Sequence, residues 1–271
     1  MKYKCLSIAG FDGSGGAGIQ ADLKTFSALG CYGMTVLTAL PVQNTCGVRE
    51  VFEIPLDSIY KQLQAIFDDI VPDSIKIGML FSEPIIELVV SFLVQYASSI
   101  PIVLDPVMIA KSGGALLLPE AVETLKTKLF PLSTIITPNI PEAYALVGKT
   151  DDFELLAEKL IRLGPKAVLL KGGHSGGKKS DDLFLDNQGI KKLLTSNRIK
   201  SKNTHGTGCT LSAAICSFLA RGATVPDSCK LAKNYLYGAI LASKDNSLGK
   251  CHGPVHHFYH LWPHLNKIIG D

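Results

Sequence analysis

The chain has 271 residues, of which 46% are hydrophobic and 19% are charged. This composition excludes a disordered chain, because the apolar side chains are numerous enough to offset the entropy of ordering. The length allows a large buried core. Lysine and arginine number 27 against 24 aspartates and glutamates, a net charge of +3. With no basic stripe in the sequence, we expect no nucleic acid among the partners.

Membrane and export signals are absent from the sequence pattern. No uninterrupted apolar stretch approaches the roughly 18 residues that a membrane span needs, so we expect no membrane partner. Residues 1–4 lead directly into a strand-like segment without the apolar core of a signal peptide. The seven cysteines are odd in number and contain no C-x-x-C pair, which predicts neither a disulfide framework nor a zinc knuckle. These features favour the reducing cytosol, and hence a cytoplasmic localisation.

Apolar runs and helical spacings alternate along the chain. Strands are expected at 5–9, 34–40, 73–77, 102–104, 134–136 and 167–170, followed by a hairpin of 183–185 with 190–194. Helices are expected at 19–29, 59–67, 85–96, 119–129, from 141 onward, 153–163, 207–219 and 226–243. This alternation predicts an α/β fold: a single domain, residues 1–271, with a mostly parallel central sheet and helices on both faces. Ligands bind beyond the carboxyl ends of such strands, so the loops there should carry the chemistry.

The first of these loops, residues 10–18, is rich in glycine. Gly13, Gly15 and Gly18 match the G-x-G-x-x-G pattern of dinucleotide-binding proteins. That pattern also needs an acid about 20 residues further on, and residues 34–43 contain none. A nicotinamide-dependent oxidoreductase is therefore disfavoured. A turn that brings the backbone close to a small ligand, or simply a tight turn, both fit the segment. No G-x-x-x-x-G-K-[ST] sequence occurs, which excludes a P-loop kinase.

A second glycine-containing segment, residues 203–210, leads into an apolar helix. At Gly206-Thr207-Gly208-Cys209 the unpaired N–H groups and the helix dipole favour an anion such as a phosphate. Cys209 would lie in the first helical turn, where the pKa of a thiol is lowered. The segment therefore predicts a phosphate site with Cys209 as the base that takes a proton from a hydroxyl. The alternative is a capped helix with a small buried cysteine.

Seven dispersed segments, residues 13–22, 39–45, 76–80, 104–108, 137–143, 171–174 and 203–209, carry motifs in a fixed order, and Gly253-Pro254-Val255-His256-His257 follows near the end of the chain. Together they resemble the hydroxymethylpyrimidine/phosphomethylpyrimidine kinases of thiamine biosynthesis, a ribokinase-like family. The resemblance runs nearly end to end. It implies a ribokinase-like fold, ATP as phosphoryl donor, Mg²⁺, a small-molecule pyrimidine substrate and a homodimer.

The resemblance also implies a reaction and a set of site residues. ATP would phosphorylate 4-amino-5-hydroxymethyl-2-methylpyrimidine, and then its monophosphate, to give the pyrophosphate. Catalysis would fall to Cys209 with the amides of Gly206, Thr207 and Gly208. The residues implied for the pyrimidine are Gly10, Gln43, Met79, Val107 and Asp22. Those implied for the nucleotide are Asp105, Asn139, Lys171, His174 and Thr204, and those for the metal are Asp105 and Glu142.

Other interpretations accompany these roles. Glu142 would also be favoured simply as an acid in a first helical turn, and Asp22 as a solvent-facing helix residue. Residues 111–114 would form either a flap over the substrate or an ordinary loop. The first loop reads Phe11-Asp12-Gly13 where the family commonly has proline after the aspartate. This departure keeps a pyridoxal kinase of the same group as the alternative enzyme. A non-catalytic small-molecule binding protein on this scaffold is the alternative of another class.

Overall fold

The computed structural model describes residues 2–108, 116–173 and 177–264. Eight strands form its main sheet, in the order β10-β9-β8-β7-β6-β5-β1-β2. Their bounds are β1 (Lys4–Ala9), β2 (Tyr32–Leu37), β5 (Ser74–Ile77), β6 (Ile102–Leu104), β7 (Ile135–Ile136), β8 (Ala167–Lys171), β9 (Lys179–Asp186) and β10 (Lys191–Asn197). All pairs from β2 to β8 are parallel, and β9 and β10 are added antiparallel. The expected α/β fold with a mostly parallel sheet is confirmed.

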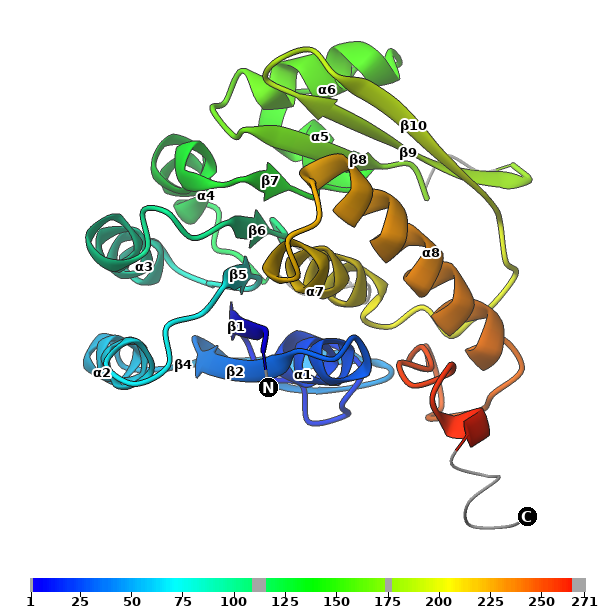
Figure 1. The fold of residues 1–271 in the computed structure, drawn as a ribbon, viewed down its shortest axis with the longest axis horizontal. Helices are drawn as coiled ribbons and strands as arrows, with labels where there is room; N and C mark the ends of the chain where they lie inside the picture. Colours follow the sequence, from blue (N-terminus) through cyan, green and yellow to red (C-terminus); the bar gives the residue numbers. More distant parts are fainter. Residues whose placement is uncertain (1, 109–115, 174–176, 265–271) are drawn as a thin grey trace.

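Helices cover both faces of this sheet (Figure 1). One face packs against α2 (Leu56–Phe67), α3 (Glu83–Tyr96), α4 (Ala121–Thr124) with the π-helical turn Leu125–Leu129 and the 3-10 turn Phe130–Leu132, α5 (Ile140–Val147) and α6 (Phe153–Ile161). The other face packs against α1 (Gly18–Ala28), α7 (Thr207–Ala220) and α8 (Val225–Ser243). Each face has its own apolar core. Within the described ranges, no helix has both the length and the apolar character to cross a bilayer.

The alternation of side chains along the strands decides which residues face α7. On β5, Ile75 and Ile77 join the core beneath α2 and α3. Ser74 and Lys76 therefore point to the opposite face, because successive side chains of a strand alternate. The thiol of Cys216 on α7 lies 3.3 Å from the hydroxyl of Ser74. Polar side chains on this face of the strands thus come to lie beneath α7.

The single strand expected over 34–40 is wrong. The chain leaves the main sheet after Leu37, and β3 (Ala39–Asn44) pairs with β4 (Gly47–Glu53) in a separate two-stranded antiparallel sheet. The side chain of Gln62 on α2 binds both the N–H and the C=O of Leu37, at 2.9 and 3.3 Å. Thr38 then donates its hydroxyl to the Met79 carbonyl at 2.6 Å. These contacts come from distant parts of the chain, so the local apolar pattern did not reveal the break.

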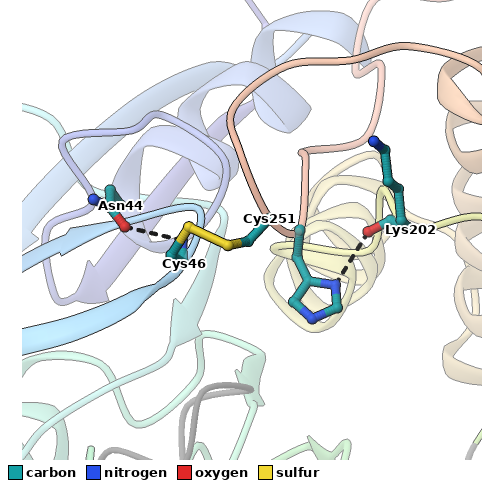
Figure 2. Close-up of a disulfide and its surroundings, with 5 residues drawn as sticks. Asn44, Cys46, Lys202 and Cys251 are labelled. Carbon is teal, nitrogen blue, oxygen red and sulfur yellow. Dashed lines mark hydrogen bonds between the residues drawn. A yellow bond between two sulfur atoms is a disulfide. The ribbon is translucent and has the colours of Figure 1, made fainter.

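A disulfide joins Cys46 to Cys251, which corrects the expectation that no disulfide would form. Figure 2 shows this bond between the turn of the β3–β4 hairpin and the loop that follows α8. The side chain of Asn44 accepts the Cys46 N–H at 2.9 Å, and the His252 N–H donates to the Thr45 carbonyl at 3.0 Å. The two cysteines are 205 residues apart. Their pairing depends on the tertiary fold, which a count of cysteines and their local spacing does not capture.

Candidate active site

The two glycine-containing segments meet where α1 and α7 begin. Gly206 has φ +72°, and a Cβ there would overlap the carbonyl oxygen of Gly16. Gly18 has φ +54°, and a Cβ there would overlap the carbonyl oxygen of Gly10. Glycine is required at both positions because a side chain has neither the conformation nor the space. The starts of the two helices are thus brought close together.

Asp12 holds these two segments together. Its buried carboxylate accepts the N–H groups of Gly16 and Ala17 at 3.1 and 2.7 Å, and both the N–H and the hydroxyl of Ser14. His205, next to Gly206, places Nε2 2.8 Å from the same carboxylate. Burial favours the neutral acid, but the hydrogen bonds from His205 and Ser14 lower the pKa of Asp12 to about 2. Sequence reasoning assigned no role to Asp12 or His205.

Three of the residues predicted for the pyrimidine lie near one another beyond β1. The Met79 sulfur lies 3.0 Å from where a Cβ of Gly10 would be, so a side chain at position 10 would crowd Met79. Gln43, on β3, donates its amide to the Phe11 carbonyl at 3.0 Å. This bond fixes the orientation of a carboxamide that has both donor and acceptor atoms. Val107 follows the end of β6.

A buried acid and lysine lie beneath the start of α7. Asp105 accepts hydrogen bonds from Lys171 Nζ at 3.0 Å and from the Thr137 hydroxyl at 3.1 Å. Above them, a Cβ on Gly208 would be 3.1 Å from Asp105 Oδ2 and 3.5 Å from Lys171 Nζ. The absence of a side chain at Gly208 therefore lets the helix start come close to this ion pair.

Glu142 and Asn139 form a reciprocal cap at the start of α5. The Glu142 N–H donates to the Asn139 side chain at 2.9 Å, and the Asn139 N–H donates to the Glu142 carboxylate at 2.8 Å. The helix-start interpretation of Glu142 is thus confirmed as one of its roles. Burial, helped by the charge of Asp105, raises the pKa of Glu142 to about 7 despite the nearby Lys171.

The carboxylates of Asp105 and Glu142 fit a divalent cation. Mg²⁺ prefers oxygen ligands and is commonly held by one or two carboxylates together with substrate phosphates and water. The pKa of Glu142 is raised because the positive charge of Lys171 does not fully offset the cost of burying the carboxylate. A bound cation would supply further positive charge there. Within the described part of the chain, no group of three or more histidine, cysteine and acidic side chains could hold a metal. A cation here would therefore depend on these two acids and on phosphate oxygens.

Cys209 lies in the first turn of α7, and the backbone N–H of Gly18 at the start of α1 favours its thiolate. The expectation of a lowered pKa is wrong for this state of the protein. Burial raises the pKa of the Cys209 thiol to about 11, although the charge of Lys76 and the Gly18 hydrogen bond act in the opposite direction. Desolvation of a thiolate outweighs the effect of the helix start on the pKa of this partly exposed residue.

The interpretation of Asp22 as a solvent-facing helix residue is wrong. Its side chain is wholly buried, so it is not a solvent-facing helix residue. Lys76 Nζ lies 2.8 Å from Asp22 Oδ2, and the Ser7 hydroxyl donates to the same oxygen at 2.5 Å. Asp22 therefore lies in a buried ion pair with β5, and its role toward the pyrimidine stays a prediction. Sequence reasoning missed Lys76, although a lysine inside a short apolar strand is itself a signal.

Thr204, His174 and the proposed flap are the remaining predictions for the site. The Thr204 carbonyl accepts the Thr207 hydroxyl at 3.1 Å, which places Thr204 at the approach to α7. His174 and the proposed flap at 111–114 lie outside the described residues.

Comparison with known proteins decides the family. The family model described as phosphomethylpyrimidine kinase matches residues 12–256. The chain belongs to this family. A hydroxymethylpyrimidine/phosphomethylpyrimidine kinase from Salmonella typhimurium is 46% identical over 268 residues, which cover 97% of this chain and 100% of that protein.

Two solved structures place this family member among related vitamin kinases. A phosphomethylpyrimidine kinase from Clostridium difficile is 47% identical and superposes with a TM-score of 0.77, covering 88% of this chain and 100% of the other. A pyridoxal kinase from Staphylococcus aureus, solved with AMP-PCP and pyridoxal, is 34% identical with a TM-score of 0.86, covering 96% and 95% of the two chains. The fold is therefore shared by kinases of two heteroaromatic substrates.

Proposed function

We propose that this protein uses ATP to phosphorylate 4-amino-5-hydroxymethyl-2-methylpyrimidine, and then its monophosphate, to the pyrophosphate used in thiamine biosynthesis. The observation that carries the proposal is the position of Gly208 and Cys209. The start of α7 lies directly over the Asp105–Lys171 pair, in a member of the phosphomethylpyrimidine kinase family. Gly10 and Met79, which lie close together, would contact the ring of the acceptor.

Positioning and charge would account for most of the catalysis. A transferring phosphoryl group spreads negative charge over its oxygens, so fixed donors near it stabilise the transition state. The N–H groups of Gly206, Thr207, Gly208 and Cys209 would bind these oxygens, and Lys171 adds a positive charge below them. Asp105 and Glu142 would hold Mg²⁺, which when bound neutralises charge on the phosphates. Asn139, Thr204 and His174 would complete the nucleotide contacts with Asp105 and Lys171.

Cys209 would act as the general base. As the hydroxymethyl oxygen attacks the γ-phosphorus, the bond to the ADP oxygen breaks and the hydroxyl proton moves to the Cys209 sulfur. Only the thiolate accepts this proton. Gln43 would orient the ring so that the hydroxymethyl group points to this sulfur.

A direct comparison of substrates tests the function. Purified protein with ATP and Mg²⁺ is expected to convert the hydroxymethylpyrimidine and its monophosphate, with pyridoxal a slower substrate. Product formation is followed by chromatography of the three reactions. Faster use of pyridoxal, with no turnover of the monophosphate, would instead identify a pyridoxal kinase. That alternative is supported by the similarity to the Staphylococcus aureus enzyme.

Removal of the proposed base tests the mechanism. Cys209→Ala should lower turnover by about 100-fold or more, the usual contribution of a general base, while calorimetry shows that the pyrimidine still binds. Cys229→Ala, which alters a buried thiol on α8, is the matched control and should keep its activity. Equal rates in Cys209→Ala and the parent would reject Cys209 as the base. Pyrimidine binding with no turnover by the parent would identify a non-catalytic binding protein.

The state of the protein in the cell follows from the same proposal. Residues 1–271 would act as a single kinase domain, which the family match over 12–256 supports. The protein would work in the cytoplasm as a homodimer.

The two-stranded sheet carries a candidate surface for this dimer. The side chains of Leu40, Val42 and Phe52, on this sheet, are substantially exposed. Leu40 pairs with Phe52 across this sheet, and Val42 lies two residues on, so the three share one face that a second copy could cover.

A further inference from the structure

The ion pair between Lys76 and Asp22 is the most deeply buried pair of charges in the described part of the chain. Neither side chain is exposed at all. Such a pair is a poor means of stabilising a fold, because removing two charges from water costs about as much as their attraction returns. The neighbours of Lys76 on its strand, Ile75 and Ile77, are apolar. Apolar side chains at positions 22 and 76 would stabilise the fold equally well. The presence of two buried charges is therefore better explained by a functional role than by stability.

The geometry directs Lys76 toward Cys209. Ser74 and Lys76 lie on the same face of β5, and the contact of Ser74 with Cys216 fixes that face against α7. Cys209 lies seven residues before Cys216, two turns away on the same side of the helix. Because α7 begins above the carboxyl ends of the strands, Lys76 extends along β5 in the direction of Cys209.

Helix α1 approaches the same point from the other side. The backbone N–H of Gly18 favours the Cys209 thiolate, and Asp22 lies one turn later on the same side of α1. Asp22 fixes Lys76 at 2.8 Å. A Cβ on Gly78 would be 2.7 Å from Lys76 Nζ, so the glycine makes room for the ammonium group. Three elements therefore converge on one buried cation and one thiol.

Four charged side chains act on this thiol from the elements around it. Lys76 on β5 favours the thiolate, whereas Asp22 on α1 and Asp105 after β6 disfavour it. Lys171 on β8 is a second cation whose own charge is favoured by Cys209. Burial raises the pKa of Cys209, and Lys76 is the strongest influence that lowers it.

We infer that Lys76 is a positioning residue for the proposed base: its buried ammonium, held by Asp22, stabilises the thiolate of Cys209 beneath the start of α7. The effect of Lys76 on turnover rests on the proposed function, because it requires Cys209 to be the base. The effect of Lys76 on the ionisation of Cys209 does not. Ionisation of the thiol can be measured without turnover.

Two variants with opposite electrostatic effects test the inference. The rate of Cys209 alkylation by iodoacetamide at pH 9 is measured in the complete chain by peptide mass spectrometry, because it reports the thiolate fraction. Lys76→Met should slow this rate tenfold or more, and Asp22→Asn should raise it. A purely structural role predicts equal damage from either half of the pair. Rates that move in the same direction, or that do not move, would overturn the inference.

Two further variants keep the test decisive if a single variant does not fold. Ser7→Ala removes a hydrogen bond to Asp22 but no charge, and should leave the alkylation rate unchanged. The double variant Asp22→Asn/Lys76→Met has no buried unpaired charge. It should be alkylated more slowly than the parent, since Lys76 influences the thiol more than Asp22 does. A rate equal to or above that of the parent would contradict the role of Lys76.

The pH profile of turnover separates this inference from the proposed base. If Cys209 is the base, kcat/KM for the pyrimidine should shift with pH in the same direction as alkylation in each variant. If alkylation responds to the charges and the kinetic profile does not, Lys76 still controls the thiol but Cys209 is not the base. The alkylation rates, and not the kinetic profile, therefore decide the inference itself.

Discussion

At the residue scale, the carboxylate of Asp12 connects the first glycine-rich loop with the segment that precedes α7. It accepts hydrogen bonds from the first loop and from His205 before α7, so one side chain sets the spacing between two loops that lie nearly two hundred residues apart in the sequence. Its pKa of about 2 in the folded protein lies below that of an unfolded aspartate. The folded state therefore binds fewer protons than the unfolded state in mildly acidic solution.

This difference predicts a stability that depends on pH. The contribution of Asp12, about 2 kcal/mol, is fully present above the unfolded pKa and is lost as pH falls through about 2. Urea unfolding between pH 5 and pH 2 should show a smaller decrease in Asp12→Asn than in the parent. Asp57→Asn, which alters an exposed aspartate paired with Lys61 on α2, is the control. An equal decrease in Asp12→Asn and the parent would contradict the assignment.

Gly206 is the second residue whose identity the geometry requires. Gly206→Ala would force a Cβ into the Gly16 carbonyl and displace the N–H groups proposed to bind phosphate. We expect a loss of kinase turnover of about 100-fold or more. Gly222→Ala is matched to it, because Gly222 also has a positive φ, +87°, but open space around it.

The control variant should lose about 1 kcal/mol of stability from backbone strain and keep its activity. Turnover in Gly206→Ala that equals turnover in Gly222→Ala would show that the close approach of the two loops is not needed for catalysis.

At the scale of elements, periodicity located almost every helix and most strands to within a few residues. The break after Leu37 was missed because it is made by Gln62, a side chain from another helix. The residues of the candidate site also fall into those that local sequence predicts and those that depend on contacts between distant segments. Gly206 to Cys209 and Asp105 could be predicted as site residues because they follow or precede regular elements. Lys76 and His205 were missed because their roles depend on partners that are brought close only by folding.

The β3–β4 hairpin is an element with a testable surface. If the face of Leu40, Val42 and Phe52 is covered by a second copy, light scattering should give the mass of a dimer for the parent. Phe52→Ser should shift the mass toward the monomer, because it places a polar group in an apolar contact. Leu155→Ser alters a similarly exposed apolar residue on α6 and should remain dimeric. A monomeric parent would contradict the proposal.

The disulfide belongs to the scale of the whole molecule, since it closes a loop of most of the chain. Cross-linking residues 205 positions apart restricts the unfolded state, which typically stabilises a protein by about 2–5 kcal/mol. Cys46→Ser/Cys251→Ser should therefore unfold at lower urea concentration than the oxidised parent.

Addition of a dithiol reductant should bring the parent to the stability of this double variant and leave the variant unchanged. A parent that is insensitive to the reductant, with two additional free thiols by titration, would show that the bond does not form in solution.

The same covalent link determines how the protein responds to a mechanical pull on its two termini. The linked cysteines are 205 residues apart, so about 700 Å of extended backbone cannot be drawn out until the sulfur–sulfur bond breaks. Strands β5 to β10 and helices α2 to α8 all lie between the linked cysteines. In the oxidised protein, an unfoldase that threads a single strand from either end would meet a doubled chain before it reached them.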